Sequence, residues 1–538
     1  MIQKLIHRRF IWVLLFGLGI LPARASAPDS VRFDFDFDFA IDTTGWLNSA
    51  NASQLFRIPV TRTGRAGIGT EAFRGEFAGF NAAETFASIE AGGESWFRLS
   101  PRTMLYGYAS FESVAEKNSN GSAFMNREER AFDIILMDPE NKGSRKTEWY
   151  RIGAAVGHEI NSRIALGLRM NYHAGNMART RDLRHTNKTL DMDVSPGATL
   201  RLSKSFQTGL HYTYKRYIEG VGFKTFGTTD QQYFTLIDFG GFWGKQEIFG
   251  SGGYTAKESA TPYVENLHEI GWQVEYRPVS SVSIFHELLI GSGDGYYGKK
   301  SSASIVYTEH DLTRIGNHFL ASVRGEKYRH HLNLYFGKYS LTNYENSWRS
   351  ETASSGNTVI EYYGKNEVGT RDRLSIAGDY ALEWGNTRTR PLWRVFAGGA
   401  YEKRDIRAVI YPYFRKQHLQ TTEMHIGTLH KRMLGRVELA SQVKVGFLTG
   451  GGDRNQDGTV VPPSSENGKP VSSDYYLDCE YNYLTASRIV PEVNIRATFP
   501  IRDIGCFAGC GYRIEQSLGT ANTGGNRQGV NVSLGVNF

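Results

Sequence analysis

The feature that most constrains this chain is an alternation of apolar and polar residues with a period of two. The clearest case runs from Arg163 to His173. Its apolar positions are Ile164, Leu166, Leu168, Met170 and Tyr172, and its polar or small positions are Ala165, Gly167, Arg169, Asn171 and His173. Because successive side chains of a β-strand point to opposite faces, this segment predicts a strand with one apolar and one polar face. The pattern recurs at 206–215, 270–276, 374–383, 437–447 and 530–538, which predicts an all-β chain.

The first residues have the features of an export signal. Lys4, Arg8 and Arg9 precede an apolar run, 10–21, that is too short to cross a bilayer as a helix. Small residues follow it, and we predict cleavage after Ala25. Residues 1–25 are therefore predicted to be a signal peptide. The alternative is a signal anchor that stays uncleaved.

Beyond this signal no run approaches the roughly 20 apolar residues that a membrane helix requires. Aromatic residues make up 13% of the chain, with 59 Gly and only 15 Pro. This composition is typical of a transmembrane β-barrel, in which only one face of each strand meets lipid. The predicted fold class is therefore a transmembrane antiparallel β-barrel. A soluble β-sandwich or propeller, whose strands also alternate, is the alternative.

Charge and cysteine content exclude several classes of function. Loss of Lys4, Arg8, Arg9 and Arg24 with the signal would lower the formal net charge from +7 to +3. A charge so nearly balanced gives no case for a nucleic-acid partner. The three cysteines predict neither a disulfide framework nor a zinc site.

Short and long polar links alternate between the alternating segments. Barrels of this class have short periplasmic turns and long extracellular loops, so the links predict both the strand count and the orientation. We predict about 18 strands: 65–78, 84–98, 102–115, 147–161, 163–178, 190–204, 206–219, 262–278, 280–292, 311–325, 328–341, 371–386, 391–409, 419–433, 435–449, 472–499, 503–516 and 527–538. The segment 472–499 is long for one crossing, and we interpret it as a single strand with a bulge near 487–491.

The chain is thus divided into the signal, a periplasmic or lumenal segment at 26–64, and a barrel at 65–538. Within 26–64, Phe residues at 33, 35, 37 and 39 alternate with Asp residues at 34, 36 and 38. One interpretation is an extra strand or strap packed on the barrel. A second is a small plug whose acidic row meets basic residues in the lumen, and a third is a disordered segment.

Two short stretches carry resemblances. Asn51, Ala52 and Leu55 are similar to the Asn-Pro-Ala stretch near the start of fatty-acid-transport-type barrels, which implies a hatch in the lumen and passage of hydrophobic molecules. The last strand, ending at Phe538, resembles the C-terminal signature of outer-membrane barrels, which implies recognition by the barrel insertion machinery. Taken whole, the chain resembles uncharacterised outer-membrane barrels of Bacteroidetes. The resemblance implies location in the outer membrane, with its lipid as a partner.

One stretch has the spacing of a metal site. Asp453, Asn455 and Asp457, followed by Gly458, match the opening of a calcium-binding loop. Ser464 stands where the bidentate Glu is expected, and an ordinary Asp/Asn/Gly turn is the alternative. Calcium is the one cofactor that the sequence suggests.

The polar faces predict a lumen lining made of residues with mixed charge: Arg169, His173, His211, Lys215, Gln273, Glu275 and Lys444. No catalytic motif is present, so we predict that the protein is not an enzyme. The favoured function is a channel or transporter for passive or facilitated passage of a solute. The alternative is a non-conducting barrel whose loops 220–261 and 342–370 bind a partner protein or a surface glycan.

Overall fold

A computed structural model describes residues 43–181, 184–224, 232–256, 261–352, 356–385, 391–502, 504–519 and 524–538. The predicted signal peptide, 1–25, and the Phe/Asp alternation at 33–39 lie outside the described residues. None of the helices in the described part of the chain is long and apolar enough to cross a membrane.

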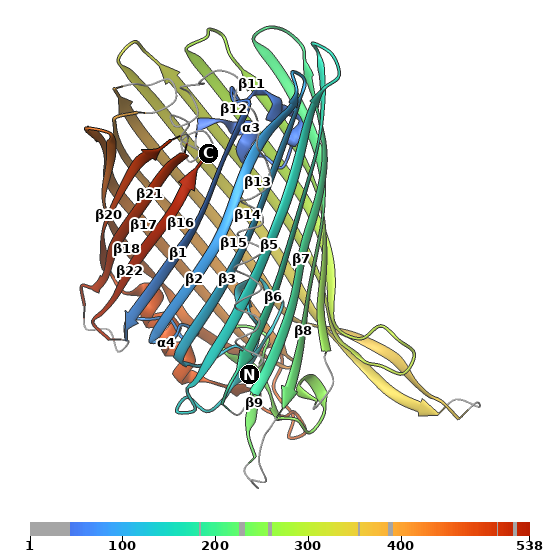
Figure 1. Ribbon diagram of the computed structural model, residues 1–538. Coiled ribbons are helices and arrows are strands. Elements are labelled where there is room, and N and C mark those ends of the chain that lie inside the picture. The colour runs from blue at the N-terminus through green and yellow to red at the C-terminus, as the bar shows by residue number, and fades with distance from the viewer. Residues whose placement is uncertain are drawn as a thin grey trace, which may run out of the picture.

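Eighteen strands of the described residues form one antiparallel sheet, and β1 pairs with both β2 and β22 to close it into a barrel (Figure 1). The strands are β1 (Arg62–Gly75), β2 (Thr85–Ser100), β3 (Thr103–Ser119), β5 (Gly143–Glu159), β6 (Ile164–Arg179), β7 (Arg184–Arg201), β8 (Phe206–Lys224), β11 (Thr261–Tyr276), β12 (Val282–Gly298), β13 (Val306–Arg324), β14 (Tyr328–Thr352), β15 (Thr358–Trp384), β16 (Trp393–Ile410), β17 (Tyr413–Leu434), β18 (Val437–Thr459), β20 (Arg488–Ile501), β21 (Ile504–Ser517) and β22 (Asn526–Asn537). The predicted class, a closed antiparallel β-barrel of about 18 strands, is confirmed.

The alternation in the sequence becomes an apolar outer surface. In β6, Leu166, Leu168 and Met170 are exposed, whereas Ala165 on the other face is buried. Exposed apolar side chains recur in strands all round the barrel, among them Ile68, Ile89, Ile152, Leu210, Trp272, Ile290, Ile315, Ile376, Ile426, Val532 and Leu534. Apolar surface on this scale requires a cover, and lipid is the cover that a closed barrel with a polar interior fits.

Short links gather at one end of the barrel, the upper end in Figure 1, which we call the turn end. They are residues 101–102, 160–163, 202–205, 277–281, 325–327, 385–392, 435–436 and 502–503. The opposite end, the loop end, carries the other links. Several of these are shorter than predicted: β6 runs to Arg179 and β7 starts at Arg184, while only Tyr411 and Pro412 separate β16 from β17. β14 and β15 form a hairpin that projects beyond the barrel (Figure 1).

The prediction of one strand over 472–499 is wrong in its first half. β19 (Val471–Ser472) leads into helix α4 (Asp474–Thr485), and only β20 crosses the barrel wall. Tyr476, Leu477 and Glu480 are the buried residues of α4, a spacing that follows one face of a helix. The segment still makes a single crossing, so the strand count is unaffected.

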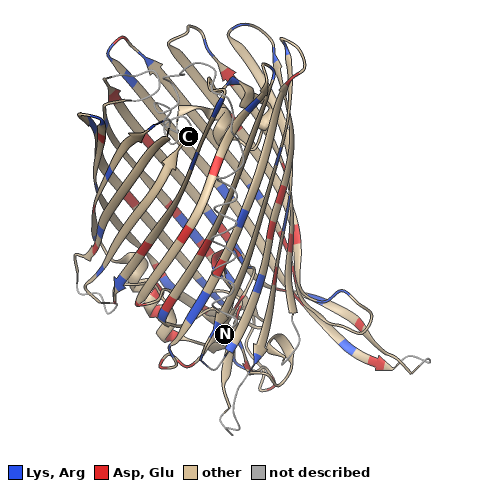
Figure 2. Ribbon diagram, in the orientation of Figure 1, with Lys and Arg blue, Asp and Glu red and all other residues tan. Residues whose placement is uncertain are grey.

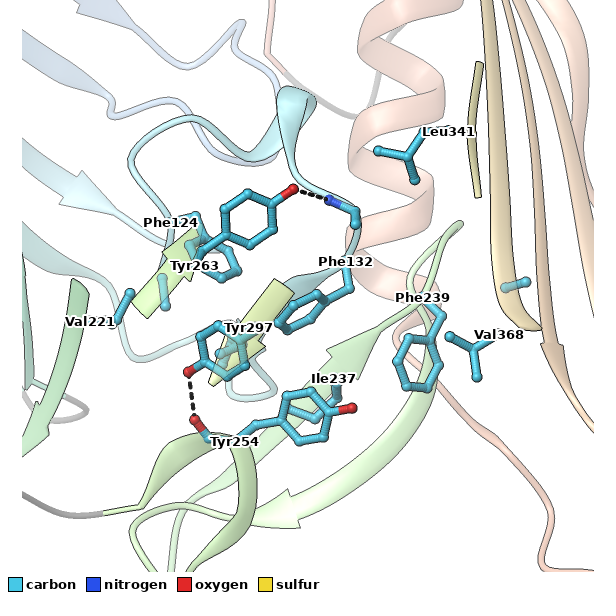
Figure 3. Packing of buried hydrophobic residues seen from close by; sticks show 14 of the residues in the cluster. Phe124, Phe132, Val221, Ile237, Phe239, Tyr254, Tyr263, Tyr297, Leu341 and Val368 are labelled. Carbon is cyan, nitrogen blue, oxygen red and sulfur yellow. Dashed lines mark hydrogen bonds between the residues drawn. The ribbon is translucent and has the colours of Figure 1, made fainter. Parts of the chain in front are cut away.

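Three links of the loop end fold together into a structure that we call the cap, residues 120–137, 232–256 and 471–485. Its sheet consists of β4 (Asp133–Leu136), β9 (Phe234–Asp238), β10 (Trp243–Ile248) and β19. Figure 3 shows Phe124, Phe132 and Tyr254 of the cap packed with Tyr263 and Tyr297 of the barrel wall. The cap therefore shares its hydrophobic core with the inner face of the barrel.

Candidate functional site

The inner face of the barrel is polar, and the residues predicted to line it lie there. Charged residues occur along the height of the strands (Figure 2). Exposed neighbours in sequence place six of the seven predicted residues on the inner face: Lys444, for example, lies between the exposed Val443 and Val445. Lys215 follows the buried His211 at an even spacing on the same strand, which puts it on the same face. Lys215 Nζ is 3.3 Å from the Asp191 carboxylate, and the Tyr108 hydroxyl is 2.9 Å from His173 Nε2. That these residues line a path for a solute stays a prediction.

At the turn end the lumen holds the N-terminal segment, which we define as residues 43–58. It contains the single helical turn α3 (Gly45–Asn48) and the 3-10 helix η1 (Ala52–Arg57). Trp46 Nε1 donates to Glu275 at 3.0 Å, and the Ser49 hydroxyl donates to Glu287 at 2.6 Å. His211, Gln273 and Glu275, three of the predicted lining residues, are thus buried near or beneath this segment.

Asn51 joins the N-terminal segment to the barrel wall. Its amide Nδ2 donates to Gln273 Oε1 at 2.9 Å and to the carbonyl oxygens of Ala198 and Leu210 at 3.1 and 3.3 Å. Its Oδ1 accepts from the backbone N–H of Ser53 at 3.1 Å, which caps η1. One side chain therefore both starts η1 and fixes it to three strands.

Glycines on the inner wall make room for this segment. A Cβ added at Gly167 would lie 2.2 Å from the backbone nitrogen of Ser53, and one at Gly157 would lie 2.5 Å from the carbonyl oxygen of Ala52. Gly197 and Gly209 lie equally close to side-chain atoms of the segment. Because any larger side chain would collide, the backbone contact depends on glycine at these positions.

The cap extends across the bore at the loop end. Hydrogen bonds join it to twelve strands, β5, β7, β8, β11, β12, β14, β15, β16, β17, β18, β20 and β21. Among them, Lys245 Nζ donates to Glu345 at 2.5 Å and Tyr483 donates to Glu515 at 3.2 Å. Since these strands lie all round the barrel, the cap covers much of the opening of the lumen at the loop end.

A buried charge cluster holds the three pieces of the cap together. Arg127 donates through Nε to Asp133 at 2.9 Å and through Nη1 to Glu480 on α4 at 2.8 Å. Asp238 on β9 lies 3.9 Å from its Nη2. Arg404 on the barrel wall donates to the second oxygen of Glu480 at 2.9 Å. The guanidinium of Arg127 also stacks over Phe80 and Phe242.

The carboxyl groups of the cap are shifted in opposite directions. Burial raises the pKa of Asp238 to about 6 and that of Glu247 on β10 to about 7. Burial also acts to raise the pKa of Glu480, but the guanidinium groups of Arg404 and Arg127 lower it to about 2. Glu480 is therefore the anion of the cluster at neutral pH, while Asp238 and Glu247 take up protons in mildly acidic solution.

The wall lines a chamber of about 480 Å³ that is open to the lumen. Its lining comes from β1, β2 and β3 and from β20, β21 and β22. The charged groups that line it are Arg65, Glu90, Glu94 and Arg496, together with the rings of Tyr106, Tyr108 and Phe507. This volume lies within the range of about 300–1,000 Å³ that is usual for small-molecule pockets.

The candidate calcium residues do not form the predicted loop. Asp453, Asn455 and Asp457 lie within β18, paired with β17, so the loop geometry is wrong. Both carboxylate oxygens of Asp457 accept from Arg415, each at 2.7 Å. In the part of the chain that the structure describes, no group of three His, Cys, Asp or Glu side chains is placed to hold a metal.

The cap and its charge cluster were not predicted. A signal for it exists in the sequence, since the apolar runs 132–137 and 234–239 lie inside links that are otherwise polar. All four residues of β4 are buried, as such a run requires. Arg127, Glu480 and Arg404 come from segments far apart in the chain, and no spacing in the sequence could have brought them together.

The closed sheet, its apolar exterior and its polar lumen define a transmembrane β-barrel. The chain belongs to a family of unknown function, DUF6850, whose model matches residues 52–538. Nothing among curated proteins matches the sequence.

Solved barrels are similar to this chain only at the level of the fold. The ferric preacinetobactin receptor BauA of Acinetobacter baumannii is 7% identical, with 89% of this chain and 79% of that chain covered and a TM-score of 0.41. A mutant of the ferric enterobactin receptor PfeA of Pseudomonas aeruginosa is 8% identical, with 89% and 81% covered and a TM-score of 0.39. A deletion mutant of the monoaromatic hydrocarbon channel TodX is 9% identical, with 91% and 92% covered and a TM-score of 0.31. At these values the likeness carries no functional argument.

Proposed function

We propose that the protein carries a solute across the outer membrane through its lumen and that the cap is the part that moves to open the path. One observation carries the proposal: a chamber lined by charged groups and aromatic rings lies inside an apolar-coated barrel whose lumen also holds the cap and the N-terminal segment. In this proposal the turn end faces the periplasm and the loop end faces outward, as in other barrels of this architecture.

The chemistry of the wall favours a hydrophilic solute over a hydrophobic one. Arg151 of β5 donates to Glu112 at 2.7 Å, and Arg314 of β13 lies 3.8 Å from Glu269. Charged pairs of this kind line the bore above and beside the chamber. A hydrophobic cargo, which the resemblance of Asn51, Ala52 and Leu55 implies, would strip water from these groups without replacing their hydrogen bonds.

Planar-bilayer recording of the purified protein tests the proposal. We expect the wild type to open in rare discrete steps and Arg127→Met, which removes the centre of the charge cluster, to open at least about tenfold more often. Arg349→Met is the matched control, because Arg349 lies on the exposed hairpin and pairs only with Glu351 and Glu361. If neither the wild type nor Arg127→Met ever conducts, the proposal fails.

A second candidate function is supported by the projecting hairpin. In a non-conducting barrel the tip of β14 and β15 would bind a partner protein or a surface glycan. Tyr363 on this hairpin is 71% exposed, and Trp348 and Tyr362 are exposed beside it. The loop 220–261 no longer serves this candidate, since its residues 232–256 are folded into the cap. A silent bilayer for both proteins above would favour it.

Three further predictions go with the proposal. Export by residues 1–25, recognition of the strand that ends at Phe538 by the insertion machinery, and the lack of enzymatic activity all follow from the sequence alone. Cell fractionation of the full chain tests the first two together, because a barrel that is exported and inserted is recovered from the outer membrane in detergent.

A further inference from the structure

The chamber has a stretch of wall without side chains next to its charged groups. Gly67 and Gly69 of β1 and Gly92 and Gly93 of β2 line it. At Gly69, which lies on the inner face next to the exposed Ile68, an added Cβ would meet no atom closer than 3.8 Å. Strand packing therefore does not require glycine at position 69, and the flat, open surface there is a feature of the chamber.

Aromatic rings stand beside this flat wall. The ring centroids of Tyr106 and Tyr108 lie 6.1 Å apart along β3, and the ring of Trp96 packs against that of Tyr106 with 4.6 Å between centroids and a tilt of 37°. Phe507 of β21 borders the same chamber under the guanidinium of Arg496. Such rings offer apolar faces to a ligand while the tyrosine hydroxyls keep their hydrogen bonds.

The polar groups of the chamber are paired and balanced. Arg65 Nε donates to Glu94 Oε1 at 2.5 Å, and the Tyr106 hydroxyl donates to Glu94 Oε2 at 2.9 Å. Two basic and two acidic side chains line the chamber, so an ionic solute of either sign would meet as many like charges as opposite ones. Each carboxylate oxygen still has a lone pair that can accept from a ligand hydroxyl.

Arg169, one of the predicted lining residues, adds a donor without a partner. Its Nε is buried and has no hydrogen-bond acceptor among the described residues, although Tyr106, Tyr108 and Asp193 lie within its electrostatic reach. A ligand that reaches this Nε supplies the acceptor that it lacks. A ligand rich in hydroxyl oxygens supplies acceptors and donors together.

From these groups we infer that the chamber binds a neutral saccharide. The sugar lies with its C–H face against Tyr106 and Tyr108, and its hydroxyls exchange hydrogen bonds with Glu94 and Arg65. The inference rests on the proposed function, since it names the class of solute that the same lumen takes up. It departs from the hydrophobic cargo implied by the resemblance of the N-terminal segment.

Isothermal titration of the purified full chain in detergent tests the inference with maltose and sucrose as neutral probes and with gluconate and glucosamine as charged ones. We expect a neutral sugar to bind saturably and both charged probes to bind at least about tenfold more weakly. Gly69→Leu fills the chamber and should weaken the sugar by at least about tenfold. Gly107→Leu is the matched control, because Gly107 lies on the outer face of β3 and a Cβ there meets nothing closer than 3.7 Å.

A second variant protects the test against misfolding. Tyr108→Leu removes an aromatic face of the chamber but keeps a bulky apolar side chain on the strand, so the barrel should fold while sugar affinity falls. Absence of saturable binding by both sugars, or tighter binding of gluconate or glucosamine, overturns the inference. Equal affinity in Gly69→Leu and Gly107→Leu does the same. If sugars fail to bind but Arg127→Met conducts, only the inference fails; if maltose binds but no variant conducts, only the proposed function fails.

Discussion

The two structures inside the barrel are held in place by different physics. The cap is joined to the wall by a shared apolar cluster and by ion pairs buried around Arg127 and Glu480. The N-terminal segment has one longer ion pair, between Arg57 Nη1 and Glu275 at 3.6 Å, and is held mainly by the neutral donors Trp46, Ser49 and Asn51 and by glycines that let its backbone touch the wall. The cap is therefore the part that a change of charge can release, whereas the N-terminal segment is released by a change of shape.

The largest effect is expected from breaking the charge cluster of the cap. In Glu480→Ala, Arg127 and Arg404 keep their buried charges but lose a shared carboxylate. Removing one partner of a buried ion pair costs about 3–5 kcal/mol, so we expect local opening of the cap to become at least about a hundredfold more frequent. Hydrogen–deuterium exchange of peptides from 474–485 and 127–137 measures this opening.

Exchange of the N-terminal segment should stay unchanged in Glu480→Ala. Glu361→Ala is the control for the cap, since Glu361 pairs with Arg349 on the exposed hairpin and such pairs contribute little. Equal exchange of α4 in Glu480→Ala and Glu361→Ala would show that the apolar cluster alone seats the cap, and the contrast between the two internal structures would disappear.

Overpacking of the inner wall should loosen the N-terminal segment and leave the cap unchanged. Gly167→Val places a β-branched side chain in a strand, which suits the wall, but its Cβ would lie 2.2 Å from the backbone nitrogen of Ser53. Overpacking of this kind costs about 1–3 kcal/mol, and we expect peptides from 45–58 to exchange at least about tenfold faster while cap peptides do not change. Gly107→Val, on the outer face, serves as control. Unchanged exchange of 45–58 would mean that the barrel wall, and not the N-terminal segment, moves to accommodate the added side chain.

Asn51 separates the two ways in which the N-terminal segment is fixed. Asn51→Ala removes the donors to Gln273, Ala198 and Leu210 and also the side chain that caps the N-terminus of η1. We expect it to lower the free energy of opening of the N-terminal segment, measured by exchange of peptides from 45–58, by about 1–2 kcal/mol. Asn51→Asp keeps the capping oxygen but turns a second oxygen towards the carbonyl groups. We expect it to be at least as disruptive as Asn51→Ala. If Asn51→Asp behaves like wild type, η1 capping matters and anchoring to the wall does not.

The strands of the barrel were predictable because lipid imposes a period of two on every crossing. The parts of the strands that extend beyond the lipid are free of that constraint. Both of their faces are polar, so their sequence pattern is the same as that of a loop. The stretch 453–458 is such a case: Asp457 pairs with Arg415 on the neighbouring strand, yet its composition is that of a turn. The same reason makes the predicted links at 179–189 and 410–418 too long.

The candidate site was predictable only in part. The lining residues follow from alternation, but what covers them does not. Arg169 is placed beside Tyr106 and Tyr108 by strand register, while His211 and Glu275 are buried by the N-terminal segment. Contacts of that kind join residues far apart in the chain, and pairing by register or folding back of a link is not encoded in any local pattern.

The smallest effect expected is a dependence of the cap on pH. Because the pKa values of Asp238 and Glu247 are raised by burial to about 6 and about 7, the folded cap binds these protons more tightly than the opened cap. Stability is therefore gained as the pH falls and is lost as the pH rises through these values. Glu480, whose pKa is lowered to about 2, acts in the opposite direction only below about pH 4.5.

Between pH 8 and pH 6 we expect the cap to gain about 1 kcal/mol, seen as slower exchange of cap peptides after correction for the intrinsic rate. Asp238→Asn combined with Glu247→Gln should flatten the dependence, because neither amide titrates in this range. Asp238 Oδ1 accepts from the backbone N–H groups of Gly240 and Trp243, and the amide oxygen introduced by Asp238→Asn can accept the same hydrogen bonds. Faster exchange of cap peptides at pH 6 would contradict this prediction. It would mean that the ion pairs of Arg127 alone determine how the stability of the cap depends on pH, and that the lumen opens in acid.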